Sequence, residues 1–225
     1  MTLRHRLELL LGLSLFLSFF SWGRRVLYPF QIFTTWIHEC CHAITAALLG
    51  GEAISITLSS DGSGLTRYKI TKGTLKHAII ASAGYLGASL SGCFIFFLAV
   101  SAEHSSRLNI RSLVIFLCTA IVLSLAFWIR NAFGFFSLLV LAAALGALNF
   151  PPAHQYAHEV LLFLAVQAGL NALFDIRILF GLGSRGGTSD AHTLQKLFYL
   201  PHYFWALAWL GLSISMMIWT IQQTI

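Results

Sequence analysis

Residues 38–42 read His38-Glu39-Cys40-Cys41-His42 and lie inside an apolar run from Val26 to Leu49. Such a run can cross a bilayer as a helix, since ~20 residues at ~1.5 Å each span the hydrocarbon core. Residues four apart share one helical face, so both histidines can bind the same Zn²⁺, and Glu39 can deprotonate a water held there. Ionisable groups at membrane depth are costly and therefore indicate a function. The stretch predicts a metal site of the kind found in zinc hydrolases, placed in a membrane-spanning helix.

The composition is that of a protein embedded in lipid. Of its 225 residues, 57% are hydrophobic and 10% are charged, whereas roughly a quarter of the residues of a soluble domain are charged. The net charge of +6 comes from Lys and Arg spread through short polar segments, where the orientation signals of membrane proteins lie. We therefore expect a multi-pass integral membrane protein that contacts the lipid bilayer and no nucleic acid. The four cysteines form no disulfide framework and are expected to be free thiols.

The apolar runs predict an all-α polytopic membrane fold with about seven (six to seven) transmembrane helices and one small β-hairpin after the zinc-motif helix. The expected spans are residues 7–22, 26–49, 78–100, 112–129, 132–150, 160–180 and 203–221. They form a single integral-membrane domain: an N-terminal span (1–25), a metalloprotease-like core (26–180), and a loop with the C-terminal span (181–225). Arg24 and Arg25 are expected to form the tight connection between the first two spans.

The hairpin is expected over residues 52–71. Ile54, Ile56 and Leu58 alternate with Ser and Thr, and a turn signal follows over residues 61–64, which read Asp-Gly-Ser-Gly. Alternation with a period of two beside such a turn is typical of paired antiparallel strands. In the next span, small residues recur every four positions and let helix backbones approach closely. They are Ala83, Gly84, Gly87, Ala88, Ser91 and Gly92.

The basic residues predict an orientation. With seven spans, ten Lys and Arg lie on the side of the N-terminus and four on the other side. Cytoplasmic segments carry the excess of Lys and Arg in membrane proteins. We therefore expect a cytoplasmic membrane, with the N-terminus and the hairpin inside.

A catalytic zinc needs a third protein ligand and an open position for water. Soluble metzincins supply a histidine six residues after the second one, but that position is Leu48 here. Asp175 is the only acidic residue well inside a later span, so it is the leading candidate. Its rival, Asp190, lies in a loop, where we expect it to cap a helix that begins near Ala191. Asn171, one turn before Asp175, is a candidate for positioning the substrate.

These motifs together resemble the site-2 protease family of intramembrane zinc metalloproteases, in particular its short branch without a PDZ domain. The segments that carry the resemblance are residues 38–42, Gly50-Gly51 with the strand after it, Ala83-Gly84-Tyr85-Leu86-Gly87, Asn171-x-x-x-Asp175, Ser189-Asp190-Ala191 and Pro201-His202-Tyr203-Phe204-Trp205. Tyr85 stands where the main family has a proline. The resemblance implies cleavage of single-span membrane proteins with one catalytic Zn²⁺ and with Glu39 as the base. It also implies that the hairpin receives an extended substrate segment.

Two other functions are compatible with the residues. One is a catalytically silent relative that binds membrane partners, since the acidic motif lacks the proline and glycine of the family. The other is a metal or proton transporter that uses the same ionisable groups as a relay, although no inverted repeat supports it. A second histidine pair, His154 and His158 beside Glu159, follows two prolines and is best interpreted as an interfacial face. The sequence does not indicate the substrate or the oligomeric state.

Overall fold

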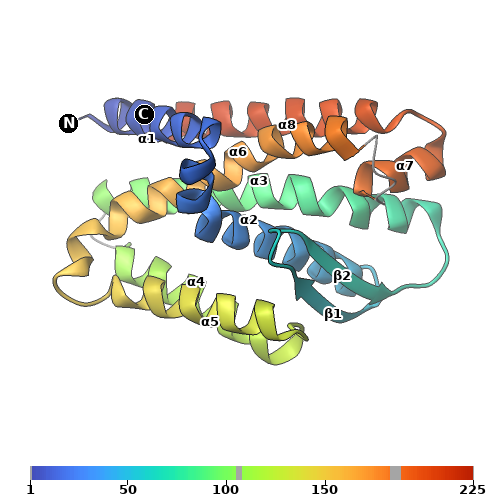
Figure 1. Ribbon diagram of the computed structural model, residues 1–225, viewed down its shortest axis with the longest axis horizontal. Helices are drawn as coiled ribbons and strands as arrows, with labels where there is room; N and C mark the ends of the chain where they lie inside the picture. Colours follow the sequence, from blue (N-terminus) through green and yellow to red (C-terminus); the bar gives the residue numbers. More distant parts are fainter. Residues whose placement is uncertain (1, 105–107, 183–188, 225) are drawn as a thin grey trace.

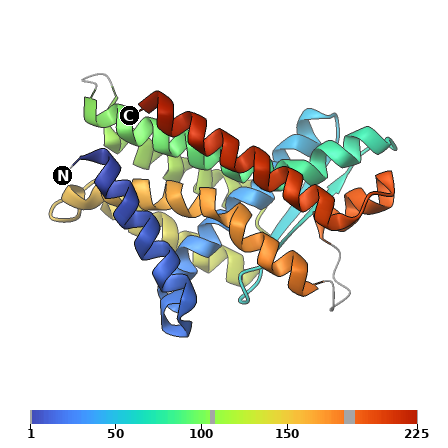
Figure 2. The same cartoon turned by 90° about the horizontal axis from the view of Figure 1, so that it is seen from above.

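The chain folds into a bundle of helices with a two-stranded sheet near one end (Figure 1). The structure is a computed structural model that describes residues 2–104, 108–182 and 189–224, apart from the side chains of residues 104 and 171–182. In chain order the elements are α1 (Leu3–Phe19), α2 (Ser21–Leu48), β1 (Glu52–Leu58), β2 (Gly64–Lys69), α3 (Thr74–His104), α4 (Ile110–Phe127), α5 (Ala132–Ala147), the 3₁₀ turn η1 (Ala153–Tyr156), α6 (Ala157–Leu182), α7 (Asp190–Phe198) and α8 (His202–Thr224). The start of α1 and the end of α8 lie at the end of the bundle opposite the hairpin and α7 (Figures 1 and 2).

Hydropathy supports fewer membrane spans than the sequence pattern predicted. Among the residues that the structure describes, α3, α4 and α8 are each long and apolar enough to cross a bilayer. Helices α1 and α2 meet that criterion as a pair bent by 120°, which raises the number to four at most. Helix α5 is apolar but shorter, and the last part of α6 lies outside the side chains described. A mostly helical integral membrane protein with one hairpin is confirmed, but seven spans are not.

A bend at one residue separates α1 from α2. Phe20 has an extended backbone, with φ −104° and ψ 143°, and interrupts the helix. Gly23 permits the bend, because a Cβ at this position would lie 2.2 Å from the backbone oxygen of Leu17. The expected connection at Arg24 and Arg25 is wrong, since both residues lie inside α2. Arginine is a good helix former, so a pair of arginines does not end a helix by itself.

The hairpin has the predicted turn and one irregularity. Strands β1 and β2 are antiparallel, with Leu58 opposite Gly64 beside the turn, and the register shifts at Ile54. Ile56 and Leu58 are fully buried, as the alternation predicted, whereas Ile54 is 43% exposed. An extra residue in one strand turns the following side chains to the other face. The predicted alternation therefore holds only beyond the bulge.

The connection between α4 and α5 covers the outer edge of β1. The Ile56 N–H donates to the backbone oxygen of Trp128 at 2.7 Å, and the Ile56 oxygen accepts from the Arg130 N–H at 3.1 Å. The Asn131 side chain then accepts from the Leu58 N–H at 3.2 Å and donates to the Leu58 oxygen at 2.7 Å. Strand β2 thus carries the one edge of the sheet that is unpaired among the described residues.

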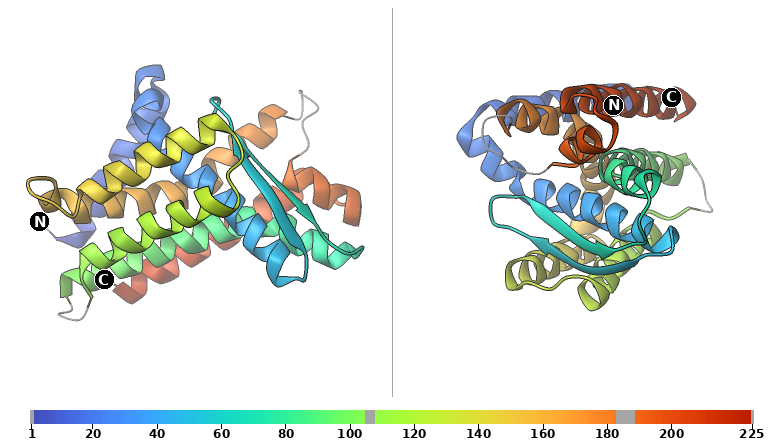
Figure 3. Two further views of the ribbon diagram at one scale, coloured as in Figure 1. Left: turned by 90° about the horizontal axis from the view of Figure 1, so that it is seen from below. Right: turned by 90° about the vertical axis from the view of Figure 1, so that its right-hand side faces the viewer.

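Helix α3 runs through the bundle and packs against α2, α6, α7 and α8. Its small residues allow this, as predicted: a Cβ at Gly92 would lie 3.0 Å from the Cβ of Ala168 in α6. A buried hydrogen bond of 2.7 Å also joins Ser89 of α3 to Ser213 of α8. Helix α2 lies between α7 on one side and the hairpin on the other (Figures 1 and 3). Side chains of α2 can therefore contact side chains of α7 and of the hairpin.

Candidate metal centre

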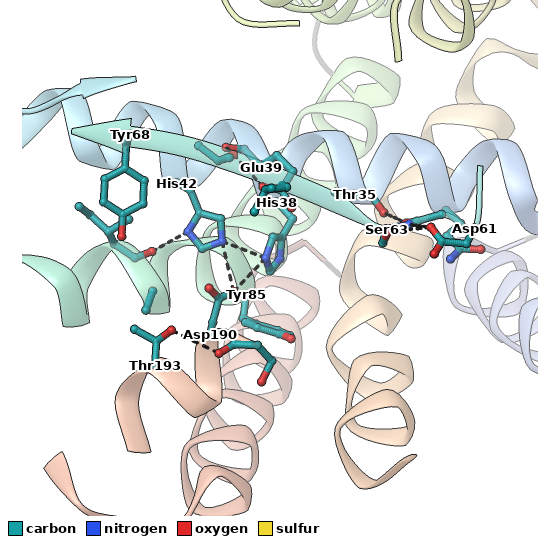
Figure 4. A pocket seen from close by; sticks show the side chains of 18 residues that line it. Thr35, His38, Glu39, His42, Asp61, Ser63, Tyr68, Tyr85, Asp190 and Thr193 are labelled. Carbon is teal, nitrogen blue, oxygen red and sulfur yellow. Dashed lines mark hydrogen bonds and ion pairs between the residues drawn. The ribbon is translucent and has the colours of Figure 1, made fainter. Parts of the chain in front are cut away.

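The two histidines of the motif lie one turn apart on α2 and point toward the same place (Figure 4). Their Nε2 atoms are 3.0 Å apart. On the other side of its ring, His42 places Nδ1 2.7 Å from the backbone oxygen of Ile80 in α3. A carbonyl oxygen only accepts, so this hydrogen bond places the ring proton on Nδ1. The His42 Nε2 atom is thereby left to bind a metal.

Asp190, the rival candidate from the sequence, reaches the histidines from α7. Its Oδ2 atom lies 3.2 Å from the Nε2 atom of each histidine. The expectation that Asp190 caps the helix is wrong, because Ser189 occupies that position and accepts from the backbone N–H of His192 at 3.3 Å. With the cap supplied by the serine hydroxyl, the Asp190 carboxylate faces α2 instead.

The three ligand atoms have the spacing that a tetrahedral zinc requires. Two atoms that are each about 2.0–2.1 Å from such an ion lie ~3.3 Å apart, and the separations here are 3.0, 3.2 and 3.2 Å. Burial raises the pKa of Asp190, but the neighbouring imidazoles of His38 and His42 outweigh it and hold that pKa below its usual range. Asp190 is therefore ionised at neutral pH, as a metal ligand must be. Two imidazoles and a carboxylate are a donor set of catalytic zinc sites.

Helix α3 leaves room for the ligands at Gly84. A Cβ there would lie 2.4 Å from His38 Nε2 and 2.5 Å from His42 Nε2. The sequence pattern assigned Gly84 to helix packing alone, so its position beside the ligand atoms was missed. The neighbouring Tyr85 sets its ring edge-on to His38, with centroids 4.8 Å apart, and stacks on Trp209 of α8 at 4.7 Å. Helices α3 and α8 thus support the His38 ring.

Glu39 lies between α2 and β2 and is only 6% exposed. Its Oε2 atom accepts a hydrogen bond of 2.7 Å from the Thr66 hydroxyl. A cleft of about 460 Å³ contains Glu39 together with His38, His42 and Asp190, and the hairpin forms one of its walls. The cleft borders the side-chain atoms of His38, His42 and Asp190 directly.

The side chains of Asn171 and Asp175 lie outside the described residues, although the backbone of α6 runs through both. The ligand role predicted for Asp175 and the positioning role predicted for Asn171 therefore stay predictions. Within the described part of the chain, one group of His, Cys, Asp and Glu side chains is arranged to hold a metal, and it consists of His38, His42 and Asp190. The spacing in the sequence predicted the pairing of the two histidines, whereas the approach of Asp190 to them depends on the position of α7.

Comparison with known proteins agrees with the geometry. The model of a family described as Peptidase M50B-like matches residues 11–220, which include both histidines, Glu39 and Asp190. No match was found among curated proteins or among solved structures. The match covers nearly the whole chain and confirms the resemblance of its motifs to the site-2 proteases. The chain therefore belongs to the Peptidase M50B-like family, within the site-2 protease group.

Proposed function

We propose that this protein is an intramembrane zinc metalloprotease that cleaves single-span membrane proteins. The observation that supports the proposal most strongly is the convergence of His38, His42 and Asp190 in one cleft with Glu39. Family membership favours a protease, and the long apolar helices favour action within the membrane. The third ligand in this proposal is Asp190.

The catalytic roles follow from the chemistry of these side chains. Zn²⁺, when bound by the two histidines and Asp190, supplies a Lewis acid for the scissile carbonyl and makes water more acidic. Glu39 accepts the proton of the attacking water and returns it to the leaving amine. The hydrogen bond from His42 to the backbone of Ile80 keeps that imidazole oriented throughout.

The substrate must be extended where it is cut, because a helix buries its carbonyl groups in internal hydrogen bonds. Strand β2 is suited to hold such a segment, since its outer edge is unpaired within the described part of the chain and the outer edge of β1 is covered. Gly64, Thr66 and Tyr68 of β2 line the cleft beside the ligand atoms. A strand added to β2 would therefore run past the metal centre.

We further propose that the hairpin end of the bundle faces the cytoplasm. The hairpin, the start of α3, the α4–α5 connection and α7 carry Arg67, Lys69, Lys72, Lys76, Arg130 and Lys196, whereas the starts of α1 and α4 carry Arg4, Arg6 and Arg111. If α1 and α2 form one bent span, the same charge rule puts the N-terminus outside, although the seven-span count put it inside. Protease accessibility of an N-terminal tag in inside-out vesicles tests this, and cleavage of that tag would contradict it.

The test of the activity is the Glu39→Gln variant. Purified protein is reconstituted into liposomes with Zn²⁺ and a panel of single-span peptides that carry Gly or Pro within the span. We expect the variant to keep its zinc and to lose cleavage by about 10²–10⁴-fold, because the proton acceptor is gone. The matched control is Glu159→Gln, since Glu159 pairs with Arg6 far from the cleft.

Each outcome of this test has a clear meaning. Cleavage by the Glu39→Gln variant at the wild-type rate would contradict the mechanism. Zinc binding by the wild type without cleavage of any peptide would favour the catalytically silent alternative.

A further inference from the structure

Strand β2 presents alternate residues to α2, and two of them lie against Glu39. Gly64, Thr66 and Tyr68 are partly buried, whereas the three residues between and after them are exposed. A strand turns every second side chain to the same face, so these three residues face the cleft together. The hairpin thus forms one wall of the cleft, and, as far as the structure describes the chain, the outer edge of β2 is also available to pair with an added strand.

The Thr66 hydroxyl lies within hydrogen-bond distance of two oxygen atoms of Glu39. Its Oγ1 atom is 2.7 Å from Glu39 Oε2 and 2.9 Å from the backbone oxygen of Glu39. A hydroxyl has one proton to donate and can also accept a hydrogen bond. It can therefore donate to the carboxylate in one orientation and to the backbone oxygen in the other.

Gly64 confines Glu39 from the same strand. A Cβ at Gly64 would lie 2.6 Å from Glu39 Cγ and 2.6 Å from Glu39 Oε1. Strand β2 therefore approaches the glutamate as closely as a backbone can, and Thr66 bonds to the other carboxylate oxygen. Strand β2 thus holds one oxygen of Glu39 by a hydrogen bond and packs Gly64 against the other, although Glu39 itself belongs to α2.

We propose that Thr66 is a positioning residue that aims the Glu39 carboxylate during proton transfer. The proposal rests on the proposed protease function. Before the reaction, the Thr66 hydroxyl donates to Oε2 of the ionised carboxylate. Glu39 takes the proton of the attacking water on the oxygen that Thr66 does not hold, while the Thr66 hydroxyl keeps Oε2 in place, so that the protonated oxygen stays directed at the reacting groups. The glutamate then gives its proton to the leaving amine, and the first arrangement returns.

Thr66→Val tests the role of the hydroxyl, because valine keeps the shape of threonine and lacks the donor. We expect kcat to fall by about 10–100-fold, as for other residues that orient a catalytic group, with KM and zinc content unchanged. Thr66→Ser should recover most of the rate, since it restores the hydroxyl. Thr57→Val is the matched control, because the Thr57 hydroxyl bonds to a backbone oxygen within the hairpin. A kcat equal to that of the control would overturn the proposal, as would a fall in kcat explained by loss of zinc.

A second readout is independent of cleavage. Thermal unfolding is measured for the zinc-free protein with Thr66→Val, with Glu39→Ala and with both changes. We expect Thr66→Val to lower Tm by roughly 2–4 °C when Glu39 is present and by much less in the Glu39→Ala background, because the lost hydrogen bond ends on the carboxylate. Equal shifts in the two backgrounds would overturn the proposal. If the wild type cleaves no peptide, the proposed function fails, but this cycle still decides whether Thr66 holds Glu39.

Discussion

Two pairs of histidines in this chain have the same spacing and a glutamate nearby, yet they lie in different surroundings. His38 and His42 belong to one continuous helix, and their Nε2 atoms are 3.0 Å apart. In the other pair, His154 lies in η1 and His158 in α6, so a junction of two helix types separates them. His154 uses its Nδ1 atom on the backbone oxygen of Leu148, at 3.0 Å. The i,i+4 spacing is therefore insufficient to place two imidazoles on one metal.

The nearby acids differ as well. Asp190 arrives from α7 and lies 3.2 Å from both Nε2 atoms of the first pair. Beside the second pair, Glu159 is engaged with Arg6 at 2.9 Å, and Arg6 also binds Glu103 at 2.6 Å. A carboxylate paired with an arginine is a poor candidate for a metal ligand, because its charge is already compensated. The two pairs therefore differ in the third side chain: a carboxylate from a distant segment reaches the first pair, whereas the carboxylate beside the second pair is held by an arginine.

The largest effect expected is on zinc binding by the two pairs. His38→Ala or His42→Ala should reduce bound zinc from about one ion per chain to nearly none, since two remaining ligands do not hold zinc firmly. The double change His154→Ala and His158→Ala should leave the stoichiometry unaltered. Measuring the zinc content of the purified proteins tests this. Loss of zinc in the variant with His154→Ala and His158→Ala would contradict the claim that only the first pair binds the metal.

The next largest effect concerns the two aspartates. Asp190→Ala should weaken zinc binding by more than about 100-fold, because even residues that only support a ligand cost 10–100-fold. Competition with a chelator of known affinity measures the change. Asp175→Ala is the paired variant, and we expect it to bind zinc like the wild type. If Asp175→Ala lost the metal and Asp190→Ala kept it, the first choice from the sequence would be the ligand.

A smaller effect is expected at the glycine beside the ligand atoms. Gly84→Ala would place a methyl group 2.4 Å from His38 Nε2, so an imidazole must move, and zinc binding should weaken by at least ~10-fold. Gly92→Ala on the same helix is the control. It crowds Ala168 and should cost about 1–3 kcal/mol of stability without changing zinc affinity. Equal zinc affinities of the two variants would show that Gly84 has only a packing role.

The smallest effect assigns a structural role to the second pair. His154→Ala removes the hydrogen bond to the Leu148 oxygen at the end of α5, which should lower the free energy of unfolding by about 1 kcal/mol. Denaturant unfolding in detergent measures this with and without added zinc. A loss of stability that appears only with zinc present would contradict a purely structural role.

Much of the fold follows from local sequence signals. The hairpin, its turn and helices α3, α4, α5, α6 and α8 agree with predicted apolar runs and turn residues, because those signals lie within a few residues of the structure they cause. The bend at Phe20 was not predicted, since it depends on Gly23 contacting the end of α1 rather than on a helix-breaking residue. The exposure of Ile54 was also missed, because a bulge has no signal in an alternating strand.

The site was predictable where it is local and uncertain where it is not. His38, Glu39 and His42 follow from helical spacing alone. Asp190 lies far along the chain, and only the packing of α7 on α3 and α8 brings it to the histidines. The sequence identified Asp190 as a candidate ligand, but its position in a polar loop favoured the interpretation that it caps a helix. In the structure Ser189 caps that helix. Thr66 carried no signal, because a threonine in a strand is ordinary.

The most direct test of the central claim is X-ray absorption spectroscopy at the zinc edge, on purified protein loaded with one zinc ion per chain. We expect two imidazole ligands and oxygen ligands at about 2.0–2.1 Å, with no sulfur in the coordination shell. A sulfur ligand at ~2.3 Å, which would come from Cys40 or Cys41, or fewer than two imidazoles would contradict a centre built from His38, His42 and Asp190.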